Sequence, residues 1–150
     1  MELTDEIRIA SPRDVVYRAL NDPDILMECI PGCEELTQKS PNELEAKVVL
    51  KIGPVKARFA GEVTLDTANA PNGFSLMGEG KGGAAGFAKG GADVSLTEEG
   101  DETVLKYTAK VDVGGKIAQL GSRLIAGTAK KLSAKFFTRF GEIVSEQSAA

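Results

Sequence analysis

Side chains that commonly perform catalysis are sparse in this 150-residue sequence. Histidine is absent, so no imidazole can act as a general base or activate a serine or cysteine nucleophile. Most carboxylates occupy outward positions of the strands that the sequence predicts. Asp5, Asp93 and Asp112 come nearest to inward positions, and none has a charged partner at matching spacing. The residue types therefore favour binding over catalysis.

The two cysteines, Cys29 and Cys33, enclose the sequence Cys-Ile-Pro-Gly-Cys. Two thiols cannot complete a tetrahedral zinc site, and no carboxylate lies at ligand spacing beside them. We predict partly buried free thiols, with a redox-labile pair as the alternative. No metal and no cofactor is expected.

A glycine-rich stretch at residues 78–83 formally matches the pattern G-x-G-x-x-G. Dinucleotide binding needs a strand before this motif and a helix after it, whereas strands are predicted on both sides here. We interpret the glycines as positions where the sheet bends and the connection is flexible. A nucleotide site is therefore not predicted.

The element that must organise the fold is a helix predicted over residues 116–147. Its apolar residues recur at helical spacing and form one stripe about 100° wide, as in a helix that covers a core. We expect this helix to cover the open face of a sheet. The stripe contains Ala118, Gly121, Ile125, Ala129, Leu132, Phe136, Phe140 and Ile143.

Alternating apolar and polar residues predict strands elsewhere. Ser11 is the expected N-cap of the first of two short helices, with Pro12 in its first turn. The predicted fold class is α+β: a curved antiparallel sheet wrapped around a long C-terminal helix, with two short helices after the first strand. The pattern indicates a strand at 2–9, helices at 12–20 and 22–29, and about six further strands, which include 43–52, 55–65, 74–81, 88–98 and 103–113, the one at 55–65 being the clearest.

The inward positions of these strands combine bulky and small residues. Small residues at the centre of a concave face either let the helix approach closely, as Gly121 and Ala129 would, or leave a space. Ile117, Leu120 and Leu124 add an apolar flank that needs extra cover. We predict an apolar cavity under the N-terminal half of the helix, with a fully packed core as the alternative. Its expected lining is Phe59, Val63, Phe74, Leu76, Leu105, Tyr107, Ile117, Leu120, Leu124 and Ile125.

The net charge is −4, yet the predicted helix carries six cations and no acid before Glu142. The rest of the chain therefore carries about −10 and would repel nucleic-acid phosphates, so no nucleic acid is expected as a partner. An anionic membrane or an acidic partner protein suits the basic face, and a merely solvated face is the alternative. The predicted surface contains Lys116, Arg123, Lys130 and Lys131, with Phe137 as an apolar foothold.

The length and composition suit one domain over residues 1–150. The sequence has no apolar run after its first residue and no stretch of roughly 18 apolar residues. We therefore expect a cytoplasmic protein whose membrane contact, if any, is peripheral.

Seven short motifs follow one another along nearly the whole chain. They are Asp22-Pro23, Cys29-Ile-Pro-Gly-Cys33, Lys51-Ile-Gly-Pro-Val55, Phe59-Ala-Gly61, Gly78-Glu-Gly80, Gly115-Lys-Ile-Ala-Gln-Leu-Gly121 and Phe136-Phe137. Together they resemble the G-subunit family of carbon monoxide dehydrogenase, or CoxG, which belongs to the START-like or SRPBCC helix-grip superfamily. The resemblance implies the same curved sheet around a long helix that the residue pattern predicts.

The resemblance also implies an accessory protein of aerobic-type, molybdenum-containing carbon monoxide dehydrogenases or related molybdenum hydroxylases. Family members are thought to bring the enzyme to the cytoplasmic membrane and to hold a lipid-like or quinone-like ligand. Some carry a C-terminal membrane-anchoring extension, which this sequence, ending at Ala150, does not show. Two other functions stay open. One is a cyclase or hydrolase of the superfamily, for which Tyr107 is the one inward aromatic hydroxyl, and the other is a protein–protein adaptor with a filled core.

Overall fold

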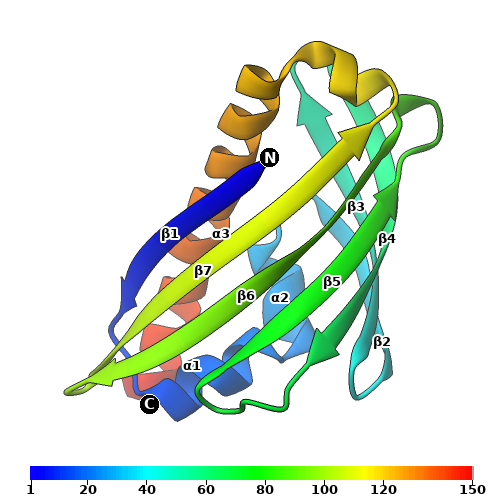
Figure 1. Ribbon diagram of the computed structural model, residues 1–150. Coiled ribbons are helices and arrows are strands. Elements are labelled where there is room, and N and C mark those ends of the chain that lie inside the picture. The colour runs from blue at the N-terminus through cyan, green and yellow to red at the C-terminus, as the bar shows by residue number, and fades with distance from the viewer. Residues whose placement is uncertain (150) are drawn as a thin grey trace.

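Seven antiparallel strands form one sheet in the order β1-β7-β6-β5-β4-β3-β2, which curves around the long helix α3 (Figure 1). The computed structural model describes residues 1–149, with side chains through residue 146. The predicted fold class is confirmed. The strands are β1 (Glu2–Ile9), β2 (Cys33–Ser40), β3 (Glu43–Ile52), β4 (Val55–Asp66), β5 (Gly73–Lys81), β6 (Phe87–Glu99) and β7 (Glu102–Gly114). The helices are α1 (Arg13–Leu20), α2 (Pro23–Cys29), α3 (Ser122–Ala149) and the short 3₁₀ helices η1 (Gly83–Ala85) and η2 (Lys116–Leu120).

The alternation of apolar and polar residues sets which side of each strand faces α3. The register brings residues of the same phase together: Leu44 lies opposite Val63, and Leu65 lies opposite Leu76. A slip of one residue would turn every apolar side chain outward, so this register is strongly specified. The first strand and the five later strands whose bounds were predicted are confirmed, with ends that shift by at most one residue.

The predicted helix at 116–147 is wrong over its first turn. Lys116–Leu120 forms η2, and Gly121 then has φ +95°, a conformation that glycine adopts without steric cost. The chain therefore changes direction before α3 begins. Ala118 and Gly121, which the pattern assigns to the apolar stripe, are exposed, whereas Ile117 is buried. The rest of the stripe is buried or half-buried, as predicted.

The two short helices begin differently. Asp22 is the N-cap of α2, and its carboxylate accepts a hydrogen bond of 3.0 Å from the backbone N–H of Asp24. Pro23 follows in the first turn of the helix. In α1 the N-cap position is Pro12, and the Ser11 hydroxyl donates to the Val144 carbonyl at 3.3 Å instead. The N-cap therefore lies one residue later than predicted, and the Ser11 hydroxyl joins the start of α1 to α3.

Buried side chains form two clusters at opposite ends of the molecule. α1, α2 and the end of α3 lie at the lower end in Figure 1, and η2 lies at the upper end. The base cluster consists of Ile9, Val16, Ala19, Leu20, Ile25, Cys29, Phe74, Leu96, Leu105, Phe140, Ile143 and Val144. The apical cluster consists of Ile52, Phe59, Ala85 and Ile117.

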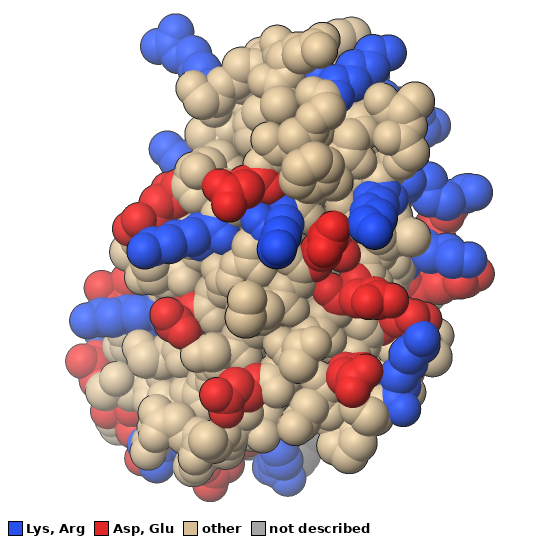
Figure 2. All heavy atoms as spheres, turned by 45° about the vertical axis from the view of Figure 1, so that its right-hand side comes forward, with Lys and Arg blue, Asp and Glu red and all other residues tan. Residues whose placement is uncertain are grey.

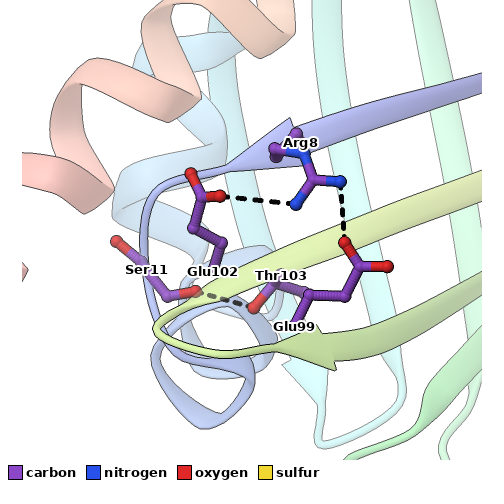
Figure 3. A network of polar contacts seen from close by, with 5 residues as sticks. All are labelled: Arg8, Ser11, Glu99, Glu102 and Thr103. Carbon is purple, nitrogen blue, oxygen red and sulfur yellow. Dashed lines mark hydrogen bonds and ion pairs between the residues drawn. The ribbon is translucent and has the colours of Figure 1, made fainter.

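A buried hydrogen bond joins β7 to the start of α1 within the base. Thr103 is fully buried, and its Oγ1 donates to the Ser11 carbonyl at 2.7 Å. On the neighbouring surface, Arg8 forms ion pairs with Glu99 at 2.7 Å and with Glu102 at 3.3 Å (Figure 3). Half-exposed ion pairs of this kind contribute little to stability, so the buried hydrogen bond is the stronger link.

Thr103→Val keeps the shape of this side chain but removes its hydroxyl donor. We expect the free energy of unfolding to fall by about 1–3 kcal/mol, because the Ser11 carbonyl loses a buried hydrogen bond. Urea denaturation followed by circular dichroism measures the change. Thr97→Val, an exposed position on β6, is the matched control and should change stability by less than about 0.5 kcal/mol. Equal losses in the two variants would contradict this role for Thr103.

Candidate functional site

Between the base and apical clusters, the residues that face α3 are only half-buried. They belong to neither cluster, although they occupy the centre of the sheet. In a close-packed interior the central positions would be the most buried ones. This middle band consists of Ala46, Val48, Gly61, Val63, Gly78, Gly80, Gly90, Ala92, Ala109 and Val111 on the sheet and Ile125 and Leu132 on α3.

The strand register gathers the small residues of the middle band side by side. Gly61 lies opposite Gly80, and Gly78 lies opposite Gly90. A Cβ atom placed at Gly78 or Gly80 would meet no atom of α3 within 4 Å, and the nearest atom at Gly80 is Phe59 Cβ at 4.0 Å. The small residues at these two positions therefore do not serve a close approach of the helix.

The residues of and before α3 also indicate that the helix does not approach the glycines of the sheet closely. A Cβ atom at Gly121 would meet nothing within 4 Å, so the prediction that Gly121 brings the helix close to the sheet is wrong. Ile117 and Leu120, which were predicted to form an apolar flank, pack in and against the apical cluster rather than in the middle band. Leu124 is 39 % exposed and reaches the β3–β4 turn, where its Cδ2 would lie 2.8 Å from a Cβ at Gly53.

The structure divides the residues that were predicted to line a cavity. Only Val63 and Ile125 lie in the middle band itself. Apart from Leu124, the others lie in or against the packed ends: Phe59, Ile117 and Leu120 at the apical cluster, and Phe74, Leu76, Leu105 and Tyr107 at the base cluster.

A groove of about 470 Å³ lies between the free edge of β1 and α3. Its lining combines apolar side chains, such as Leu3, with the polar groups of Lys130 and Ser133. Tyr107 also lines it, with its ring stacked on Phe137 at a centroid distance of 5.8 Å. The groove adjoins the middle band, because Leu3 pairs with Ala109, a middle-band residue of β7. Sequence reasoning missed it, since no local pattern shows that β1 is the edge strand beside α3.

The cations of the predicted basic surface are all exposed: Lys116, Arg123, Lys130 and Lys131. Among the described residues, no ion pair involves any of the four, whereas Arg139 further along α3 pairs with Glu28 and Glu142. Phe137, the predicted foothold, is half-buried and packs against the base cluster. No helix within residues 1–149 is both long and apolar enough to cross a membrane.

Cys29 is buried and Cys33 is half-buried, and both are free thiols, as predicted. Burial raises the pKa of Cys29 to about 11 and also raises the pKa of Cys33. Both thiols are therefore protonated at neutral pH and are poor nucleophiles. In the described part of the chain, no group of three or more possible ligand residues could hold a metal ion.

The chain matches a known protein family over nearly its whole length. The model of that family, the G subunit of carbon monoxide dehydrogenase (CoxG), matches residues 6–145. The chain belongs to the CoxG family. The resemblance inferred from the seven motifs is confirmed, and the match runs from within β1 to near the end of α3.

Solved structures place this CoxG-family chain among START/SRPBCC folds. A conserved protein from Geobacillus kaustophilus is 28% identical with a TM-score of 0.91, and the alignment covers 97% of this chain and 96% of that one. A START superfamily protein from Mycobacterium smegmatis is 12% identical, with a TM-score of 0.73 and coverage of 97% and 98%. The Zhui aromatase/cyclase from Streptomyces sp. R1128 is 11% identical, with a TM-score of 0.73 and coverage of 98% and 94%. The last two likenesses concern the fold alone. Curated protein sequences yield no significant match.

Proposed function

We propose that this CoxG-family protein is a non-catalytic accessory protein that binds an apolar, lipid-like or quinone-like molecule. The ligand occupies a hollow between the base and apical clusters, lined by the middle band and covered by α3. The half-burial of the middle band, beside glycines that α3 does not approach, is the observation that carries the proposal. The band contains no charged side chain, which suits an apolar ligand.

The groove between β1 and α3 offers a place for the polar part of such a ligand. The hydroxyls of Tyr107 and Ser133 and the ammonium group of Lys130 are donors that suit a quinone carbonyl or a lipid headgroup oxygen. Hydroxyl donors fix the orientation of an otherwise apolar ligand, because each unpaired polar group in a hollow is costly. The tail would then lie over the small residues of the middle band.

The family name supports a proposal for the partner enzyme. We assign the protein, as one domain without a cofactor of its own, to an aerobic-type molybdenum carbon monoxide dehydrogenase or a related molybdenum hydroxylase in the cytoplasm. The basic surface supports a link to the cytoplasmic membrane, because its four cations have no ion-pair partner in the described part of the chain. Catalysis by the chain itself has little support, since histidine is absent and both thiols are protonated.

Solvent extraction of the purified protein followed by mass spectrometry tests the proposal. We expect an apolar molecule at near-stoichiometric amounts, released only by denaturing solvent. The same extraction of protein washed with detergent, followed by reloading with a quinone or a phospholipid, shows which class rebinds. A protein that neither releases nor rebinds an apolar molecule would be a filled scaffold, and the proposed function would be wrong.

A further inference from the structure

The upper end of the molecule in Figure 2 shows cationic and uncharged residues but no acidic ones. This end is built from the β3–β4 turn, η1, η2 and the start of α3. Five exposed cations belong to it: Lys51, Lys56, Lys81, Lys116 and Arg123. With the exposed side chains of Phe87 and Leu124 they form what we call the apical patch.

Acidic residues approach the apical patch only at Lys81, which lines a hollow together with four glutamates, among them Glu62 and Glu79. The segments 46–61, 80–92 and 113–141, which meet at this end, contain no Asp or Glu. None of the five apical cations takes part in an ion pair among the described residues. Lys51 and Lys56 lie directly opposite each other on β3 and β4, an arrangement of like charges that destabilises a sheet. Unpaired and mutually repelling cations indicate that their counter-charge lies outside the molecule.

The apical patch also exposes apolar surface. Phe87 is 42 % exposed and Leu124 is 39 % exposed, and both lie among the cations. A hollow beside Phe87 is lined by Lys81, Gly83, Gly86 and one acidic residue, Glu79. A ring of cations around exposed apolar side chains is the composition by which proteins bind an anionic bilayer surface.

We propose that the apical patch docks the protein on an anionic lipid bilayer, with Phe87 and Leu124 entering the headgroup layer. This inference rests on the proposed function, because it places the apical end of the ligand hollow against the membrane. The five cations add to the attraction individually, and the remaining negative charge of the chain orients the base away from the bilayer.

The residue types favour lipid over an acidic protein as the occupant. Four of the five cations are lysines, which are depleted at the centres of protein–protein interfaces. Lysine is a flexible point charge that suits scattered phosphates, whereas a fixed array of carboxylates is better matched by the planar fork of arginine. A mobile, two-dimensional array of phosphates is what a lipid surface presents.

The first test is flotation with vesicles of phosphatidylcholine alone or with about 30 % phosphatidylglycerol, at about 0.15 M salt. Lys51→Glu, Lys56→Glu and Lys81→Glu are combined in one apical variant. Lys106→Glu, Lys110→Glu and Lys135→Glu form the matched control, with the same change of charge at exposed positions of β7 and α3 outside the patch. We expect the apical variant to lose at least about tenfold in partitioning to anionic vesicles, and the control to lose less than about threefold.

The second test uses tryptophan, which the chain lacks. Phe87→Trp reports on the apical patch, and Met77→Trp, 68 % exposed on the outer face of β5, is the matched control. On adding anionic vesicles, we expect a blue shift of the emission of Phe87→Trp and no shift for Met77→Trp. This readout is independent of the charge variants, so it decides the matter even if they fold poorly.

The possible results distinguish the docking from the ligand hollow. Equal losses in the two charge variants, a larger loss in the control, or no preference of the native chain for anionic vesicles would overturn the apical docking, and the last result would point to an acidic protein as the occupant. Extraction of the same preparations tests the ligand hollow separately. Native protein that releases an apolar ligand but does not float refutes the membrane docking and leaves the ligand hollow standing, whereas protein that floats without a ligand refutes the ligand hollow and leaves the docking standing.

Discussion

Gly80→Leu should strongly weaken binding of the apolar ligand while the sheet remains folded. Gly80 is in β5, faces α3 and is not among the glycines with positive φ, so a side chain can be added without backbone strain. Its new Cβ would meet only Phe59 Cβ, at 4.0 Å. The leucine side chain would therefore occupy the space over the middle band. We expect the affinity for a reloaded quinone or phospholipid to fall by at least about tenfold, equivalent to about 1.4 kcal/mol.

The stability of Gly80→Leu separates a hollow from a packed core. In a hollow, the added side chain buries apolar surface and replaces a glycine in a strand, so the free energy of unfolding should be unchanged or higher. In a filled core, the same leucine would overpack the interior and cost about 1–3 kcal/mol. For this one variant, ligand binding therefore reports whether the leucine blocks the ligand, and chemical denaturation reports whether the space was empty before the substitution.

Ala60→Leu is the matched control for this experiment. Ala60 precedes the inward Gly61 on β4 and is exposed on the opposite face, where it pairs with Lys81. The added leucine has the same size but points away from α3. We expect ligand affinity to stay within about twofold of the native protein, because surface substitutions away from a site are nearly neutral. A loss of affinity in Ala60→Leu as large as that in Gly80→Leu would show that the effect is not steric occupation of the hollow.

The strands could be predicted closely because each carries its own two-residue period. The β3–β4 hairpin is an example: apolar residues alternate on both sides of the Gly53-Pro54 turn, and the structure pairs Ile52 with Val55. The start of α3 could not be predicted in the same way. The apolar residues within 116–120 recur at helical spacing just as the residues after Gly121 do. The positive φ of Gly121, which ends this continuity, does not change the spacing of apolar residues and so cannot be seen in the sequence.

The candidate site was harder to predict than the fold because it depends on contacts between distant elements. The small residues Gly78 and Gly80 predict either a space or a close helix, and only the position of α3 distinguishes the two. Likewise, no sequence pattern shows that Ile117 and Phe59 join one cluster at the apex while Phe74 and Leu105 join another at the base. The predicted lining was therefore a list of inward residues rather than a list of residues around one space.

The separation into two clusters has a consequence for stability. If the middle of the molecule holds a ligand, the packed ends must supply most of the stability of the ligand-free chain. The base cluster is much the larger of the two and joins α1, α2 and α3 to β1, β5, β6 and β7. Substitutions there should therefore be far more damaging than substitutions of equal size in the middle band.

Phe140→Ala should be the most destabilising of the substitutions considered. Phe140 is fully buried at the centre of the base cluster, and its ring stacks on Phe136 at 5.9 Å and meets Phe137 edge-on at 6.4 Å. Removing a buried phenyl ring costs its transfer free energy and leaves a cavity, about 3–5 kcal/mol together. That is a large fraction of the roughly 5–15 kcal/mol that stabilises a typical domain. For a chain of this size we expect a fall in Tm of about 6–20 °C.

Phe87→Ala is the matched control, because it removes the same ring from a position that is 42 % exposed. Its cost should be below about 1.5 kcal/mol, since much of the ring is already in contact with water. Thermal and urea denaturation of ligand-free protein measure both variants, and ligand-free samples are required because a ligand bound to the native state would mask the difference. If the two variants lost similar stability, the base cluster would not be the main source of the stability of the fold, and the division of the interior into a packed base and an open middle would be wrong.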